Sequence, residues 1–116
     1  MSILNSALIE LDPETVNIML QAGEAVLVDV REDEEYAEER IAGSVLSPMS
    51  DFELDAWPSF PGKKVIISCL GGVRSAAIGN KLIASGHGWV SHMKGGLNAW
   101  KDAGLPTIMA NDDTTP

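Results

Sequence analysis

Short apolar runs alternate with segments of helical periodicity along most of this chain. Residues 25–30 (AVLVDV), 64–68 (KVIIS) and 89–93 (WVSHM) are brief and largely apolar, which is typical of strands that are covered on both faces. Residues 44–46 (SVL) predict another short strand. Strands that alternate with helices in this way indicate an α/β domain around a mostly parallel sheet, in which ligands bind beyond the carboxyl ends of the strands.

Start and stop signals predict the helices between these strands. Asp12 is an N-cap candidate, Pro13 suits the first helical position, and Glu14 is favourable in a first turn. A helix is therefore predicted to begin at this point and to end near Gly23. Further helices are predicted over residues 32–39, 75–85 and 97–103.

Composition limits the size, the partners and the location of the protein. The 116 residues suffice for one domain, which we assign to residues 1–108, followed by a polar tail at 109–116 that we expect to be flexible. The net charge of −9 argues against nucleic acid or an anionic membrane as a partner. No apolar run approaches the roughly 18–20 residues that cross a bilayer, and the first residues lack the basic region of a secretory signal. The single cysteine excludes an internal disulfide, so we expect a cytoplasmic protein.

The reactive chemistry of the chain is concentrated in residues 69–75 (CLGGVRS), directly after a predicted strand. Gly71 and Gly72 can adopt backbone conformations closed to other residues, so that successive N–H groups turn inward and form a cradle for an anion at a helix start. A helix N-terminus and a nearby cation such as Arg74 favour the thiolate of Cys69, and Ser75 can cap the helix. We therefore predict that Cys69 is a nucleophile rather than an apolar filler at the end of a strand.

Three motifs extend over most of the chain. Residues 69–75 match C-x-x-G-x-R-S, residues 29–36 match D-V-R-x-x-x-E-Y, and residues 95–106 match G-G-x-x-x-W-x-x-A-G-x-P. Together they make the chain resemble the single-domain rhodanese (thiosulfate sulfurtransferase-like) family. The chain departs from that family where G-H-I-x-G-A is common, because Arg40 replaces the usual histidine. We expect this change to affect local packing or substrate access and not the basic reaction.

The resemblance implies a three-layer fold, with a mostly parallel sheet of about five strands and helices on both faces. It also implies a sulfurtransferase in which the Cys69 thiolate takes the outer sulfur of thiosulfate or a related sulfane donor, sulfite leaves, and a persulfide remains. Cyanide, a small thiol or the thiol of a partner protein then accepts the sulfur. Since the chain has no second cysteine, that acceptor is external. We expect neither a metal site nor another cofactor.

Several residues are expected to support Cys69. We assign substrate binding to Leu70, Gly71, Gly72, Val73, Arg74 and Ser75, with Leu70 and Val73 as an apolar collar around the thiol. Asp29 and Arg31 follow a neighbouring strand at the same edge of the sheet. In one interpretation, Asp29 steadies the Cys69 loop by binding the backbone N–H groups of that loop. In the other, Arg31 pairs with a nearby carboxylate and Asp29 only caps its own turn. The sequence is compatible with both interpretations.

The remaining aromatic and imidazole side chains have structural interpretations. Tyr36 is the expected inward residue of the acidic helix at 32–39. The three aromatic side chains of the acidic segment 50–60, a predicted helix or loop, are expected to cover the core rather than to line the site; they are Phe52, Trp57 and Phe60. His87 and His92 are predicted to be ordinary surface histidines.

Two other functions are open as alternatives. A cysteine-dependent phosphatase or arsenate reductase uses the same sequence of strand, loop and helix. Such enzymes have a motif of the type C-x5-R, however, whereas Cys69 to Arg74 is C-x4-R. They would also need a general acid, and no residue of the sequence stands out as one. A non-catalytic rhodanese-like module that binds or regulates a partner would be expected to lack the cysteine, which is present here.

Overall fold

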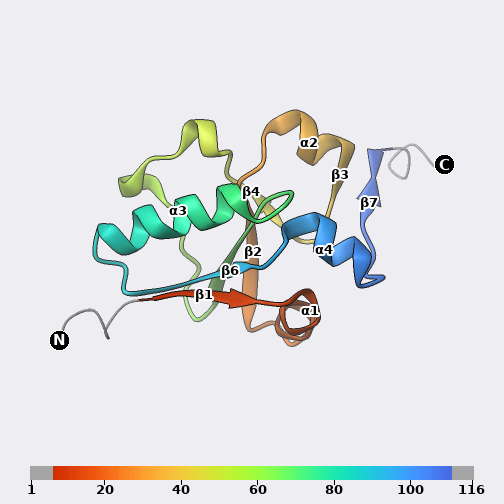
Figure 1. Ribbon diagram of the computed structural model, residues 1–116, viewed down its shortest axis with the longest axis horizontal. Helices are drawn as coiled ribbons and strands as arrows, with labels where there is room; N and C mark the ends of the chain where they lie inside the picture. Colours follow the sequence, from red (N-terminus) through yellow and green to blue (C-terminus); the bar gives the residue numbers. More distant parts are fainter. Residues whose placement is uncertain (1–6, 111–116) are drawn as a thin grey trace.

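Five parallel strands form the centre of the computed structural model, which describes residues 7–110 (Figure 1). They are β1 (Ala7–Leu11), β2 (Ala25–Asp29), β4 (Val45–Leu46), β5 (Lys64–Ser68) and β6 (Trp89–Met93). Their order in the sheet is β1-β6-β5-β2-β4, and each pair of neighbours is parallel. The predicted α/β class with a parallel sheet is confirmed.

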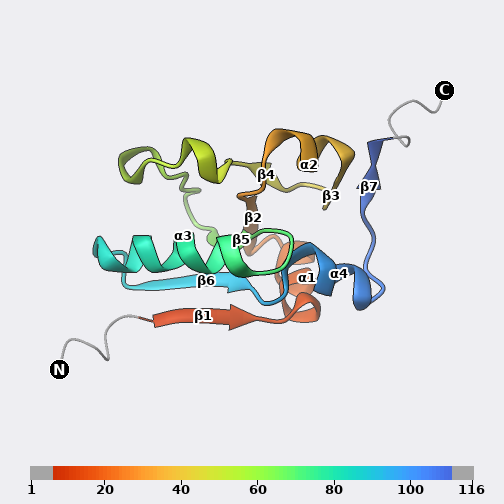
Figure 2. The ribbon, with the colours of Figure 1, turned by 45° about the horizontal axis from the view of Figure 1, so that its top comes forward.

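Helices cover both faces of this sheet, as predicted. They are α1 (Pro13–Gln21), α2 (Asp33–Glu38), α3 (Val73–Ala84) and α4 (Gly96–Asp102). One buried core includes Val16 of α1 and Trp100 of α4, whereas the other includes Ile78 of α3. Ile66 and Ile67 are neighbours on β5 and belong to different cores, because successive side chains of a strand point to opposite faces. Figure 2 shows α3 running along one face of β6.

The start of α1 follows the predicted signals. The Asp12 carboxylate accepts a hydrogen bond of 2.8 Å from the N–H of Thr15, and Pro13 occupies the first turn. This contact satisfies one of the N–H groups that a helix start leaves without an intrahelical partner. The helix ends at Gln21, shortly before Gly23, which has a φ of +72°.

Three strands were not anticipated from the sequence. β1 is the edge strand beside β6, and its residue Glu10 pairs in register with His92. A separate two-stranded sheet joins β3 (Glu39–Arg40) to β7 (Ile108–Met109) in antiparallel orientation. β7 therefore includes the first residue of the expected tail, while residues 111–116 lie outside the described part of the chain.

The acidic segment between β4 and β5 contains two short 3-10 turns, at Met49–Asp51 and Leu54–Ala56, in place of an α-helix. Phe52 and Trp57 contact each other edge to face, with ring centroids 5.7 Å apart. Both rings, together with Phe60, pack against the core under α3, which agrees with the interpretation that they cover the core. Within residues 7–110, no helix combines the length and the apolar character that crossing a membrane requires.

Candidate active site

The loop that bears Cys69 connects β5 to α3 at the carboxyl end of the sheet. Asp29, the last residue of β2, lies beside Ser68 in the strand register. α3 begins two residues earlier than predicted because its N-cap is Gly72, whose φ of +99° belongs to the left-handed region that favours glycine. Cys69 itself is only 1% exposed. The short connection therefore buries the thiol between the end of a strand and the start of a helix.

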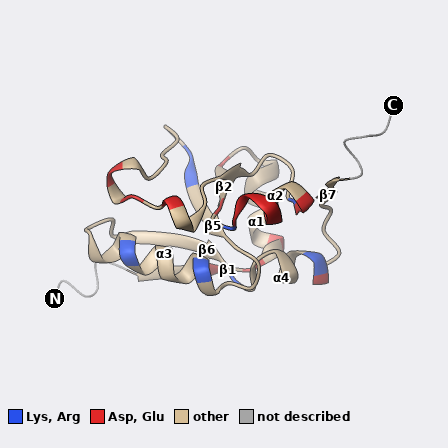
Figure 3. Cartoon of the chain, turned by 90° about the horizontal axis from the view of Figure 1, so that it is seen from above, with Lys and Arg blue, Asp and Glu red and all other residues tan. Residues whose placement is uncertain are grey.

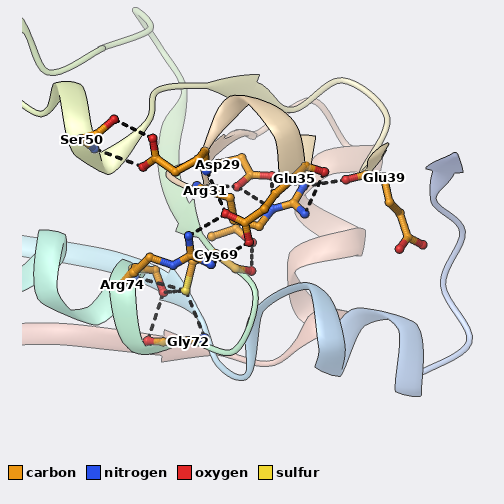
Figure 4. Close-up of polar contacts among 11 residues, drawn as sticks. Asp29, Arg31, Glu35, Glu39, Ser50, Cys69, Gly72 and Arg74 are labelled. Carbon is orange, nitrogen blue, oxygen red and sulfur yellow. Dashed lines mark hydrogen bonds and ion pairs between the residues drawn. The ribbon is translucent and has the colours of Figure 1, made fainter. Parts of the chain in front are cut away.

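Two backbone N–H groups, one in the loop and one in the first turn of α3, point at the sulfur of Cys69. Gly72 N–H donates to Sγ at 3.1 Å (Figure 4), and Ser75 N–H donates to the same atom at 3.3 Å. The Ser75 hydroxyl is 3.5 Å from the same sulfur. N–H donors and the start of a helix stabilise negative charge, so this geometry favours an anionic sulfur at that position.

The N-terminus of α4 binds the other side of the loop backbone. Leu97 N–H donates to the carbonyl of Cys69 at 2.8 Å, and Asn98 N–H donates to that of Leu70 at 3.0 Å. Gly96, with a φ of +58°, lies so close that a Cβ atom on it would be 2.4 Å from the Cys69 oxygen. The closing motif at 95–106 thus contacts the Cys69 loop, which its distance from Cys69 in the sequence does not reveal.

Arg74 forms a bidentate ion pair with Glu35 of α2. Its Nη1 and Nη2 atoms lie 2.7 and 2.9 Å from the two carboxylate oxygens. This pair lowers the pKa of Glu35 from its ordinary value of 4.5 to about 2 and raises the pKa of Arg74. Acidic residues make up most of α2, which is largely red in Figure 3. Arg74 is therefore not a free cation, a point that sequence reasoning missed because the partners are 39 positions apart.

Arg31 and Asp29 form a buried ion pair next to the loop. The Asp29 carboxylate accepts bonds of 3.0 Å from both the backbone N–H and Nε of Arg31, and of 2.8 Å from Nη2 (Figure 4). Among the described residues, no hydrogen bond joins the Asp29 side chain to the loop N–H groups. Arg31 also donates to the backbone oxygens of Glu35 and Glu39, at 3.4 and 2.7 Å. The pair thereby fixes the backbone of α2, from which Glu35 reaches Arg74.

The collar residues and Arg40 lie on the outside of this arrangement. Val73 is 80% exposed and Leu70 is 39% exposed, whereas Cys69 is buried. The Arg40 guanidinium lies 5.3 Å from the centre of the Tyr36 ring, whose hydroxyl donates to the carbonyl of Ser44 at 2.6 Å. Arg40 thus packs on an aromatic face near the loop that follows α2.

The surface prediction holds for His87 and is wrong for His92. His87 is exposed in the turn before β6, whereas His92 is 1% exposed. β6 is an interior strand between β5 and β1, and β1 was not predicted. The His92 ring is 2.8 Å from Ser75 of α3 and 3.1 Å from Glu10 of β1, so these two elements surround it.

Neither a metal centre nor a large cavity coincides with the Cys69 loop. Within residues 7–110, no group of three or more His, Cys, Asp or Glu side chains could hold a metal ion. A cavity of about 480 Å³ lies at the amino-terminal ends of β5 and β6, away from Cys69, and its lining includes Lys64, Trp89 and Trp57. None of residues 69–75 lines that cavity, so the Cys69 loop and the cavity are separate parts of the structure.

A family model for the rhodanese-like domain matches residues 12–103. The chain belongs to the rhodanese-like family. It is 36% identical over 101 residues to the thiosulfate sulfurtransferase GlpE of Actinobacillus succinogenes, an alignment that covers 86% of this chain and 90% of that protein. It is 35% identical over 96 residues to the uncharacterized protein slr1261 of Synechocystis, covering 83% of this chain but 54% of the relative.

A solved structure shares the fold. The rhodanese-like domain of Alr3790 from Anabaena superimposes with a TM-score of 0.72 at 30% identity, covering 92% of this chain and 83% of that one. These similarities confirm the three-layer rhodanese fold and support sulfurtransferase activity at the level of the family.

Replacing Gly96 with alanine is expected to destabilise the protein through the loop carbonyl. The new methyl group would collide with the Cys69 oxygen at 2.4 Å, and the positive φ adds strain, so we expect a loss of about 2–4 kcal/mol in the free energy of unfolding. Urea unfolding at neutral pH measures this loss. Gly104→Ala is the matched control, because its φ is +78° and nothing lies within 4 Å of the added Cβ. Equal losses in the two variants would contradict the proposed collision.

Glu35→Gln is expected to change how stability depends on pH. The pKa of Glu35 is about 2 in the folded protein and 4.5 ordinarily, so its ion pair stabilises the fold fully above about pH 4.5 and less as pH falls toward 2. The variant should be less stable by about 1–2 kcal/mol at pH 7, after allowance for solvent screening of a partly exposed pair. Urea unfolding at several pH values should show this gap closing below about pH 4.5. Glu34→Gln, on the exposed side of the same helix, should show no such gap.

Proposed function

We propose that the protein is a sulfurtransferase that moves a sulfane sulfur from thiosulfate or a related donor to a thiophilic acceptor through a persulfide on Cys69. The observation on which the proposal rests is the pair of N–H groups, from Gly72 and Ser75, aimed at Sγ. Family membership and the sulfurtransferase relatives support the same reaction class. The proposal explains why a lone cysteine lies inside a glycine-containing turn at the start of a helix.

The reaction takes place in two displacements. The Cys69 thiolate attacks the outer sulfur of thiosulfate, a sulfur–sulfur bond forms to Sγ, and the bond to the sulfonate sulfur breaks to release sulfite. The persulfide has a negatively charged terminal sulfur, which backbone N–H groups of residues 70–75 would bind, among them those of Gly72 and Ser75 that point at Sγ. An acceptor thiolate or cyanide then attacks that terminal sulfur and releases the Cys69 thiolate. No redox partner or cofactor enters this balance.

The donor anion has to approach a protein whose net charge is −9. The start of α3 and the loop N–H groups attract it locally, because helix N-termini bind anions. Arg74 adds positive charge, but its guanidinium is shared with Glu35 at 2.7 and 2.9 Å. In this proposal Glu35 orients Arg74 and also competes with the sulfonate for it. Asp29 and Arg31 support the site indirectly by fixing the backbone of α2.

The acceptor in this proposal comes from outside the chain. Cys69 is the only cysteine, so no second thiol of this chain can displace the sulfur as an intramolecular disulfide. Leu70 and Val73 present apolar surface beside the thiol, which suits the stem of a small thiol or the residues around a partner's cysteine. We propose a cytoplasmic location on the same grounds, because a reducing compartment keeps acceptor thiols available.

Incubation with thiosulfate is expected to add the mass of one sulfur atom to the protein. Intact mass spectrometry under non-reducing conditions measures the gain, and dithiothreitol should reverse it because the persulfide is reduced by thiols. Cys69→Ser should gain nothing. If the wild-type protein stays unmodified with thiosulfate and with other sulfane donors, the proposed function is wrong.

Lengthening the loop is expected to separate sulfur transfer from phosphatase chemistry. One glycine inserted between Gly72 and Val73 moves the helix start away from Sγ and removes the 3.1 and 3.3 Å contacts. We expect sulfur loading from thiosulfate to slow by about tenfold or more, as two N–H contacts to an anion together contribute over 1.4 kcal/mol. Hydrolysis of p-nitrophenyl phosphate, which we expect to be absent in the wild type, is the comparison assay. Unchanged loading in the insertion variant would show that loop size does not determine the reaction.

A further inference from the structure

His92 is a buried imidazole that takes no part in the two displacements of the proposed reaction. Its ring lies between an edge strand and the active-site helix: Nε2 is 3.1 Å from a carboxylate oxygen of Glu10, and Nδ1 is 2.8 Å from Oγ of Ser75. The side chain of His92 is 1% exposed, whereas that of Glu10 is 53% exposed. Figure 2 shows β6, which bears His92, between β1 and α3. A chain of contacts therefore leads from solvent to the helix that starts at the loop.

The partners of the ring determine where its protons lie. Nε2 faces a carboxylate, which only accepts hydrogen bonds when ionised, so Nε2 must bear a hydrogen. In the neutral ring the other nitrogen, Nδ1, is then an acceptor. Nδ1 consequently accepts a hydrogen bond from the Ser75 hydroxyl, and it becomes a donor only when the ring is protonated.

The Ser75 hydroxyl connects this ring to the thiol. It has one hydrogen and two possible acceptors, the Nδ1 of His92 at 2.8 Å and the carbonyl of Gly72 at 3.3 Å. The shorter contact to the imidazole is the stronger one. The lone pairs of the oxygen remain for the S–H group of Cys69, which lies 3.5 Å away. The geometry thus contains a continuous path from Sγ through Oγ to Nδ1.

We propose that Glu10, His92 and Ser75 form a proton relay that generates the Cys69 thiolate. The S–H bond breaks and its electron pair stays on Sγ; the proton passes to Ser75 Oγ, whose own hydrogen passes to Nδ1 of His92. The imidazolium that results is paired with the Glu10 carboxylate. Ser75 touches the reacting sulfur, and His92 and Glu10 are positioning residues that act through it. The relay deepens the proposed sulfurtransferase, since it names how the nucleophile of that reaction forms.

The charges around His92 favour this direction of transfer. β1 contributes the Glu10 carboxylate, which stabilises the imidazolium, and the residue of β5 in register with His92 is the apolar Ile67. α3 contributes the uncharged Ser75, and the guanidinium of its neighbour Arg74 is paired with Glu35. The thiolate that forms accepts hydrogen bonds from the N–H groups of Gly72 and Ser75. Both products of the transfer therefore have partners in place.

Thiolate absorbance at 240 nm tests the relay without any sulfur donor. Since Cys69 is the only cysteine, the difference between each protein and its Cys69→Ser counterpart reports this thiol alone as pH is raised. Glu10→Gln removes the carboxylate charge from a half-exposed side chain, so the fold should persist. We expect the pH at half-maximal thiolate to rise by about one unit, because the imidazolium loses its partner. His92→Gln and Ser75→Ala should each shift it in the same direction.

The sign of this shift distinguishes a relay from simple electrostatics. If His92 stayed neutral throughout, removing a negative charge near the thiol would lower the pH of thiolate formation or leave it unchanged, and either result in Glu10→Gln would overturn the relay. Glu14→Gln, an exposed residue of α1 that loses the same charge, should behave like the wild type. Nitrogen-15 NMR provides a second readout: a neutral His92 ring with its hydrogen on Nδ1 would also overturn the proposal.

The same experiment separates the relay from the proposed function. Thiolate formation needs no sulfur donor. If the variants show the shift but the wild type takes no sulfur from any donor, the relay is supported and the proposed sulfurtransferase function is wrong. If Glu10→Gln is loaded with sulfur as fast as the wild type at every pH, the sulfurtransferase proposal stands and the relay is wrong. If both proposals hold, Glu10→Gln is loaded with sulfur more slowly than the wild type below the shifted pH. The rate falls by about tenfold for each unit of the shift, in proportion to the thiolate present.

Discussion

The shape of the Cys69 loop depends on the hydrogen bonds that α4 donates to it. Leu97 and Asn98 bind the carbonyl oxygens of Cys69 and Leu70, and the planarity of each peptide unit then limits the directions available to the N–H groups that follow. Gly72 supplies the left-handed turn that brings its own N–H and that of Ser75 to the sulfur. A segment far along the chain thus forms the support on which the anion cradle is built.

Two ion pairs beside the Cys69 loop are linked through α2. The buried pair of Asp29 and Arg31 fixes the backbone of α2, and α2 presents Glu35 to Arg74. The one arginine of the loop is therefore partly neutralised, and backbone N–H groups with the start of α3 supply much of the positive potential at the sulfur. Such dipoles are fixed by the fold, whereas a long arginine side chain has to be held in place by its partner.

Local patterns in the sequence predicted most of this architecture, while contacts between distant residues could not be predicted. The apolar runs match β5 and β6, and the signals at Asp12 and Pro13 match the start of α1, because these depend on neighbours in the sequence. β1 was missed because ALIEL has a charged residue among its apolar ones and pairs with a strand near the other end of the chain. Without β1, nothing indicated that His92 is buried or that Glu10 is its partner.

The depth of the sulfur has a consequence for partner choice. Cys69 is 1% exposed, whereas its neighbours in the sequence Leu70 and Val73 are 39% and 80% exposed. In the proposed transfer, an incoming thiol has to project beyond the surface that bears it in order to touch the persulfide. Acceptors are therefore sorted by reach, which admits a slender molecule or the tip of a protruding loop and rejects a cysteine set in a flat face.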